Sequence, residues 1–116
     1  MAEDDEAPTY KRYVGIVCED SEWRVSVVDG GRSYALPLRL ELRNHSPTGF
    51  AWGYFGSGPS QLALALLADC IGDERAQRGG LYHRFKDQVI GRLEQDKGWT
   101  MAEEAVWAWV SRNEGA

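Results

Sequence analysis

The segment "RNHSPTG", residues 43–49, gathers side chains that could bind an anion. Arg43 and His45 are donors that suit carboxylates and phosphates, and Asn44, Ser46 and Thr48 add neutral donors and acceptors. The same residue types also favour an Asx or Ser-Pro turn that satisfies its own backbone. The sequence leaves both interpretations open.

A glycine loop, Gly56-Ser57-Gly58-Pro59, precedes an almost wholly apolar segment. Pro59 suits the first position of a helix, with Gly58 as its N-cap, and the free amides at a helix start attract anions. The loop matches none of the three glycine motifs that carry chemistry. It lacks the lysine of the GxxxxGK[ST] motif. Gln61 occupies the position of the third glycine of GxGxxG, and Phe55 occupies the position of the first glycine of GxSxG. The alternative to an anion site is a tight joint between a strand and a helix.

Aromatic residues flank this loop and add a third possible element of a site. Trp52 and Tyr54 share one face of an expected strand, where they form either part of the core or a stacking platform for a nucleobase. The sequence therefore predicts a ligand-binding set made of Arg43, Asn44, His45, Ser46, Thr48, Trp52, Tyr54, Gly56, Ser57, Gly58 and Gln61.

Catalysis and metal binding have weaker support. A catalytic His45 needs a nucleophile and an orienting acid, and the adjacent Ser46 is badly placed for that role. His83 is interpreted as a residue of a solvated helix face. Cys18 and Cys70 lack paired spacing, so we expect reduced, buried thiols and no metal or cofactor.

Length and charge define the class of protein. The 116 residues predict one domain over residues 9–113, preceded by a disordered acidic tail, residues 1–8. Four acidic residues in that tail leave 13 basic against 14 acidic residues elsewhere, so the body has a charge of about −1. No basic stripe predicts binding to duplex nucleic acid. No apolar run is long enough to span a bilayer and no secretory signal is visible, so we expect a cytoplasmic protein.

Hydrophobic periodicity predicts the elements that hold these residues. Strands are expected over 10–18, 22–29, 34–42 and 50–55, the third from leucines at every second position. Helices are expected over 59–71 and 81–95, with a polar turn over 73–78 and a stop at Gly72. A last helix should open with a capping box, Thr100 and Glu103. The predicted class is α+β, with a small antiparallel sheet of about four strands followed by three helices packed on one face.

The last helix carries two tryptophans near the end of the chain. Val106, Trp109 and Val110 share one face and Trp107 lies on another. Aromatic residues are enriched at subunit interfaces, so Trp107 and Trp109 are candidates for a homo-oligomer contact.

Three segments together resemble a family of short uncharacterised proteins: "LRNHSPTGFAWGYFGSGPSQLALALLADCIGD", "YHRFKDQVI" and "GWTMAEEAV". The resemblance covers roughly residues 36–110. It implies a phage or mobile-element setting, and hence the cytoplasm of a bacterial or archaeal host cell, and it carries no known activity.

Three functions of different classes follow. The first is a non-enzymatic protein that sequesters a small anionic, nucleotide-like ligand, in the phage setting a host immune signal. The second is a protein-binding inhibitor or adaptor of a host factor, acting through Arg39, Glu41 and Arg43, a sheet edge or the Trp107 region. The third is a hydrolase of small nucleotides that uses His45.

Overall fold

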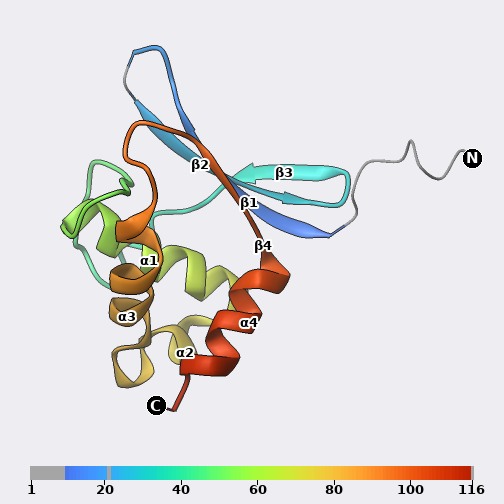
Figure 1. The fold of residues 1–116 in the computed structure, drawn as a ribbon, viewed down its shortest axis with the longest axis vertical. Helices are drawn as coiled ribbons and strands as arrows, with labels where there is room; N and C mark the ends of the chain where they lie inside the picture. The colour runs from blue at the N-terminus through green and yellow to red at the C-terminus, as the bar shows by residue number, and fades with distance from the viewer. Residues whose placement is uncertain (1–9, 21, 116) are drawn as a thin grey trace, which may run out of the picture.

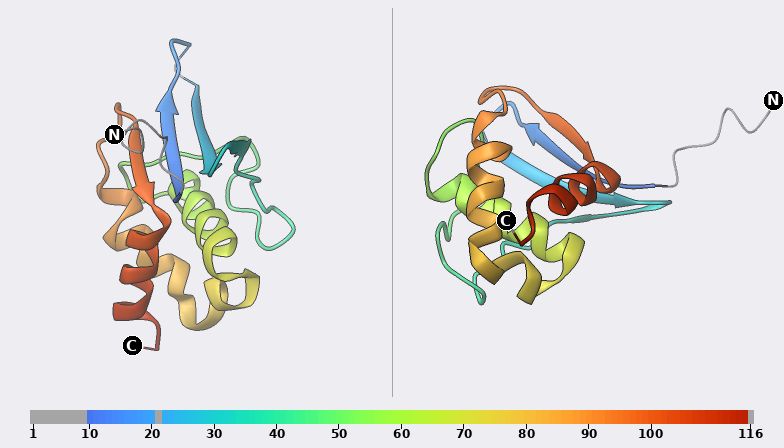
Figure 2. Two further views of the ribbon diagram at one scale, coloured as in Figure 1. Left: turned by 90° about the vertical axis from the view of Figure 1, so that its right-hand side faces the viewer. Right: turned by 60° about the horizontal axis from the view of Figure 1, so that its bottom comes forward.

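The computed structural model describes residues 10–20 and 22–115, so the expected tail lies outside the described residues. The fold is α+β, as predicted: a four-stranded antiparallel sheet with its helices packed on one side (Figures 1 and 2). The order of the strands in the sheet is β3-β2-β1-β4. The elements are β1 (Lys11–Val17), β2 (Trp23–Asp29), β3 (Arg32–Ala35), α1 (Ser57–Ile71), α2 (Asp73–Gln77), η2 (Arg78–Gly80), α3 (Leu81–Gln88), η3 (Ile90–Arg92), β4 (Trp99–Ala102) and α4 (Glu103–Asn113).

β1 and β2 form where the sequence predicted them, β1 from its β-branched and aromatic residues and β2 from alternation. Tyr13 pairs with Val27, and both are buried, as is Val25 two positions earlier on β2. Residues at every second position of a strand share one face, so these side chains make the sheet's contribution to the core.

The predicted strand over 34–42 is wrong beyond its first residues. β3 ends at Ala35, and the chain leaves the sheet after the amide of Leu36 donates to the carbonyl of Val25 at 3.0 Å. Pro37 has no amide to give to a strand partner, and Arg39 has a left-handed φ of 62°. The leucines after Leu36 therefore belong to an irregular loop.

The fourth strand also comes from a different place. Residues 50–55 form no strand and instead pack on η3, where the amide of Gly53 donates to the carbonyl of Ile90 at 3.1 Å. The sheet is completed by β4, which pairs with β1. Thr100 lies inside β4 and α4 begins only at Glu103 with Ala102 as N-cap, so the predicted capping box is wrong.

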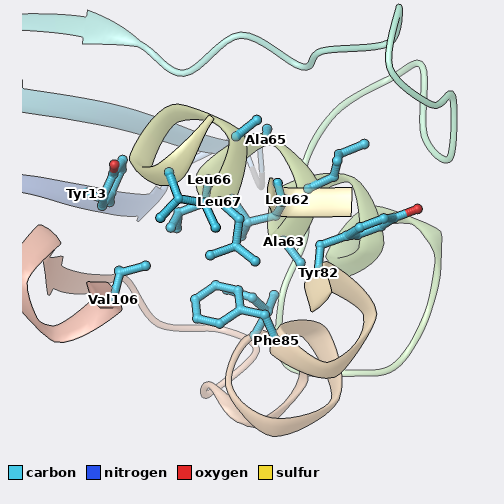
Figure 3. Close-up of a cluster of buried hydrophobic side chains, with 14 of the residues drawn as sticks. Tyr13, Leu62, Ala63, Ala65, Leu66, Leu67, Tyr82, Phe85 and Val106 are labelled. Atoms are coloured by element: carbon cyan, nitrogen blue, oxygen red, sulfur yellow. The ribbon is translucent and has the colours of Figure 1, made fainter. Parts of the chain in front are cut away.

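α1 occupies the interior, as its apolar circumference predicted, and begins at Ser57 with Gly56 as N-cap rather than Gly58. Figure 3 shows its leucines packed against Tyr13, Phe85 and Val106. It ends at the expected stop, Gly72, whose φ is 97° and whose amide donates to the carbonyl of Ala68.

The segments after α1 depart from their predicted bounds. The expected turn over 73–78 is mostly the short helix α2. The helix expected over 81–95 ends at Gln88, because Val89 leaves helical geometry with φ −124° and ψ −64°. In α4 the predicted faces are confirmed: Val106, Trp109 and Val110 are buried and Trp107 is exposed. Trp109 packs on Phe85, so of the two candidate contact tryptophans only Trp107 lies at the surface.

No helix among the described residues is both long and apolar enough to cross a membrane.

Three tryptophans join the sheet to the irregular loop. Trp52 stacks on Trp23 with ring centroids 4.9 Å apart and meets the ring of Trp99 edge-on at 5.6 Å. Its indole nitrogen donates to the carbonyl of Lys97. The ring of Trp99 in turn lies directly over Gly15 of β1, which pairs with it. The absence of a side chain at residue 15 makes room for this arrangement.

Replacing Gly15 by alanine should therefore destabilise the fold. A Cβ at this position would lie 2.4 Å from the Trp99 ring, and overpacking of this kind costs about 1–3 kcal/mol. Gly31→Ala is the matched control, because a Cβ there meets nothing within 4 Å. Urea unfolding of both variants measures the difference, and equal midpoints would show that Trp99 does not need the space above Gly15.

Candidate functional site

Gln61 connects the loop after β3 to the buried helix α1. Its side chain is fully buried and makes four hydrogen bonds. Oε1 accepts from the amides of His45 and Ser46 at 2.7 and 2.9 Å, and Nε2 donates to the carbonyls of Leu38 and Arg43 at 2.6 and 3.0 Å. The amide thus satisfies four backbone groups that have no sheet or helix partner. Gln61 has a structural role, and it holds the backbone of the residue 43–46 turn in place.

This turn brings His45 against α3. His45 Nε2 lies 2.8 Å from the hydroxyl of Tyr82, and the rings of His45 and His83 are nearly perpendicular at 5.9 Å. The ring of His83 also packs against Tyr82 in a tilted arrangement, with centroids 4.1 Å apart and 31° between the planes. Tyr82 is itself buried, and its hydroxyl points away from the core side chains in Figure 3. His45 is therefore fixed at both its backbone and its ring.

Both histidines have a lowered pKa. Burial, and then the charges of His83, Arg43 and Lys86, lower the pKa of His45. Burial, Lys86 and Arg43 also lower the pKa of His83, against a smaller opposite effect of Asp87. A bound anion would offset the repulsion between these positive charges. We call Arg43, His45, Tyr82, His83 and Lys86 the histidine cluster.

The glycine loop is occupied by side chains of the same chain. A Cβ at Gly56 would lie 2.6 Å from the ring of Tyr54, and one at Gly58 would lie 2.6 Å from the Cβ of Ala51. Ser60 already donates its amide to the carbonyl of Gly56, and Pro59 has none to offer. This geometry favours the tight joint over an anion cradle, with Tyr54 covering the start of α1.

The other predicted residues divide between the core and the surface. Trp52 is fully buried between Trp23 and Trp99, so its ring has no face for a ligand. The Ser46 hydroxyl donates to the carbonyl of Gly49 at 2.8 Å, which closes the turn. Asn44, Thr48 and Ser57 are exposed.

Of the predicted set, His45 contacts residues that the sequence did not single out, and Arg43 lies two positions before it in the same turn. Tyr82, His83 and Lys86 were missed because their relevance depends on where the 43–46 turn lands. One signal was available: the three fall within a single turn of an expected helix, where residues three and four apart are neighbours. No group of three or more His, Cys, Asp or Glu side chains in the described part of the chain could hold a metal ion.

The fold and these contacts define a small α+β protein in which a turn packs His45 against Tyr82 and His83 of α3. The chain belongs to the family of unknown function DUF6166, whose model matches residues 13–112. No match was found among the curated proteins or among the solved structures.

Replacing Gln61 by leucine keeps the volume and removes all four hydrogen bonds. Each buried backbone group left unpaired costs about 1–3 kcal/mol, so we expect a loss of at least about 2 kcal/mol in the free energy of unfolding. Hydrogen exchange of the His45 and Ser46 amides should accelerate in the folded protein. Gln77→Leu, which removes a single exposed contact to Asp73, is the control and should change stability by less than about 0.5 kcal/mol. Unchanged exchange at His45 would show that Gln61 does not hold the turn.

Proposed function

We propose that this protein is a non-enzymatic binding protein that captures a small phosphate-bearing, nucleotide-like ligand at the histidine cluster. The observation that carries the proposal is the packing of His45 on α3, with its Nε2 2.8 Å from the Tyr82 hydroxyl and its ring 5.9 Å from the ring of His83. Arg43 lies two residues before His45, and Lys86 lies three residues after His83 on α3. Burial first, and these cations after it, lower the pKa of both histidines. A phosphate placed among them would be attracted by both cations and could accept from both imidazoles.

Preorganisation supports this role. Gln61 holds the backbone of His45, and the Tyr82 hydroxyl holds its ring, so little side-chain freedom is lost on binding. Lys86 has only 18% of its side chain exposed and lies 3.6 Å from Asp87. An ion pair this long at a surface is weak, which leaves Lys86 able to turn to a ligand.

The aromatic pair supports a nucleotide-like ligand. His83 is exposed, and its ring is backed by Tyr82 at 4.1 Å. Histidine and tyrosine rings are surfaces on which unpaired bases stack, with about 1–3 kcal/mol per base. In the phage or mobile-element setting that the resemblance implies, the captured ligand would be a host immune signal, and binding without turnover would suffice to remove it.

A hydrolase that uses His45 is the alternative at the same site. The neighbour of His45 Nε2 is a tyrosine hydroxyl, whereas a catalytic histidine is typically oriented by a carboxylate. This contact favours capture over turnover.

The first test is thermal unfolding with a panel of cyclic and linear nucleotides. A true ligand at 100 times its Kd adds about 2.7 kcal/mol of stability, which raises the Tm by several degrees. Arg43→Gln and His83→Gln should each reduce the affinity about tenfold, by analogy with other charge-assisted hydrogen bonds. Arg112→Gln, an exposed arginine in the last turn of α4, is the control.

Two outcomes contradict the proposal. If no nucleotide of the panel raises the Tm, the proposed capture function is wrong. A ligand that is recovered chemically altered after denaturation of the complex assigns the site to hydrolysis.

The second test is the pH dependence of binding. The lowered pKa values mean that the histidines of the free protein stay neutral to lower pH, and a bound anion favours their charged forms. Binding should therefore take up protons, and affinity should rise as pH falls from 8 to 6, by up to about tenfold per pH unit for each histidine that is protonated. A phosphodiester such as a cyclic nucleotide is the right probe, because its own charge is constant over this range. His83→Gln should make the affinity depend less on pH. An affinity independent of pH in the unmodified protein would show that the ligand does not bind at the histidines.

A further inference from the structure

Arg39 has an unusual backbone conformation. Among the residues that the structure describes, it alone other than glycine has a left-handed φ, of 62°. Contacts of Cβ with the neighbouring backbone disfavour this conformation for every residue that has a side chain. Such a residue persists only where its surroundings hold it in place, and strained residues of this kind gather at functional sites. The contacts of Arg39 must therefore offset the strain of its backbone.

The backbone of Arg39 closes a turn over residues 38–43. Its carbonyl accepts from the amides of Leu42 and Arg43, at 3.0 and 3.5 Å. Gln61 Nε2 donates to the carbonyls of Leu38 and Arg43, which are the two ends of this turn. The turn is thus tied to α1 at its base, and it leads directly into the segment that carries the histidine cluster.

The side chain of Arg39 ties the same turn to α2. Its Nε donates to Glu41 at 2.6 Å, and its Nη2 donates at 2.7 Å to Asp73, the first residue of α2. The Arg39 side chain is 23% exposed, whereas those of Asp73 and Glu41 are 49% and 65% exposed. One guanidinium therefore joins the turn both to itself and to a helix 34 residues further along the chain.

The turn has two attachments that differ in chemistry. Gln61 holds it from the buried side through uncharged hydrogen bonds, on which dissolved salt has little effect. Arg39 holds it from the outside through ion pairs whose carboxylates face water, and salt screens such pairs. The outer attachment is therefore the one that solution conditions can open.

We propose that Arg39 is an electrostatic latch and a positioning residue for the histidine cluster. Its ion pairs with Glu41 and Asp73 hold the 38–43 turn on α2, and the held turn keeps His45 against α3. When the latch opens, the turn stays attached through its base but His45 leaves α3 for part of the time. The effect on ligand affinity rests on the proposed function above, whereas the latch itself acts in the protein without ligand.

Hydrogen exchange of the full chain without ligand is the first measurement. Arg39→Gly removes both ion pairs, and glycine adopts the left-handed conformation without strain. An exposed ion pair changes an equilibrium constant about 1.5- to 5-fold, so the amides of Leu42 and Arg43 should exchange at least about twofold faster. Asp73→Asn leaves residue 39 unchanged and should accelerate the same amides. Arg39→Lys keeps the charge and should restore part of the protection.

Salt distinguishes an electrostatic latch from a purely steric role of Arg39. Raising sodium chloride from about 0.1 M to about 1 M shortens the Debye length from about 10 Å to about 3 Å. Exchange of the Leu42 amide should therefore accelerate in the unmodified protein. It should respond much less to salt in Arg39→Gly and in Asp73→Asn, where the latch is already open.

The ring of His45 gives a second readout, which a change in overall stability would not move. Burial is the largest cause of its lowered pKa, so a turn that leaves α3 should raise that pKa toward the ordinary value of histidine. Titration of the ring by nuclear magnetic resonance measures this change in Arg39→Gly. Glu22→Gln is the matched control, because it removes an exposed 2.7 Å ion pair with Arg24 just before and within β2 and should change neither readout.

Three results would overturn the latch. Arg39→Gly could leave the exchange of Leu42 unchanged, or salt could act equally on the unmodified protein and on Asp73→Asn. The amides of α1 could also accelerate together with those of the turn, which would show that Arg39 supports the whole fold. Nucleotide binding is measured separately by thermal unfolding. If exchange responds as expected and no nucleotide binds, the latch is confirmed and the proposed function is wrong.

Discussion

The arrangement of this molecule depends on one buried amide. α1 is apolar over nearly its whole length, and the chain between Leu36 and Gly56 has no strand or helix to satisfy its backbone. Gln61 joins the two, because its fully buried side chain on α1 forms hydrogen bonds with four backbone groups of that loop. A buried amide with only half of its hydrogen bonds would give a less stable protein than a leucine at this position. All four hydrogen bonds of Gln61 are therefore needed together. The position of His45, and with it the histidine cluster, follows from this contact.

The sequence predicted the fold class, the first two strands, the buried helix α1 and the faces of α4, because each depends on local periodicity or on a turn residue. It failed where tertiary contacts override a local pattern. The alternating leucines after Ala35 predict a strand, but Pro37, the left-handed Arg39 and the contact of Gln61 with the Leu38 carbonyl take that segment out of the sheet. Thr100 and Glu103 have capping-box spacing, yet pairing with β1 and the packing of Trp99 on Gly15 make the segment a strand.

The candidate site shows the same division. Arg43 and His45 were predicted from composition alone, because their chemistry is a property of the residues themselves. Trp52 was ambiguous, and only the contacts with Trp23 and Trp99 place it in the core. Tyr82, His83 and Lys86 could not be joined to His45 without knowing that the 43–46 turn packs on α3, a contact between positions 37 residues apart in the chain.

α1 anchors two distant parts of the chain through Gln61 and Asp69. Gln61 holds the turn that carries His45, and Asp69 accepts from the hydroxyls of Tyr13 and Tyr34 and pairs with Lys11 of β1. Eight residues of helix place these positions about 12 Å apart along the axis and about 80° apart around it. Both contacts tie α1 to segments far away in sequence, so a change in one is expected to leave the other in place. The interior helix therefore fixes the position of the His45 turn and of the sheet through two separate polar contacts.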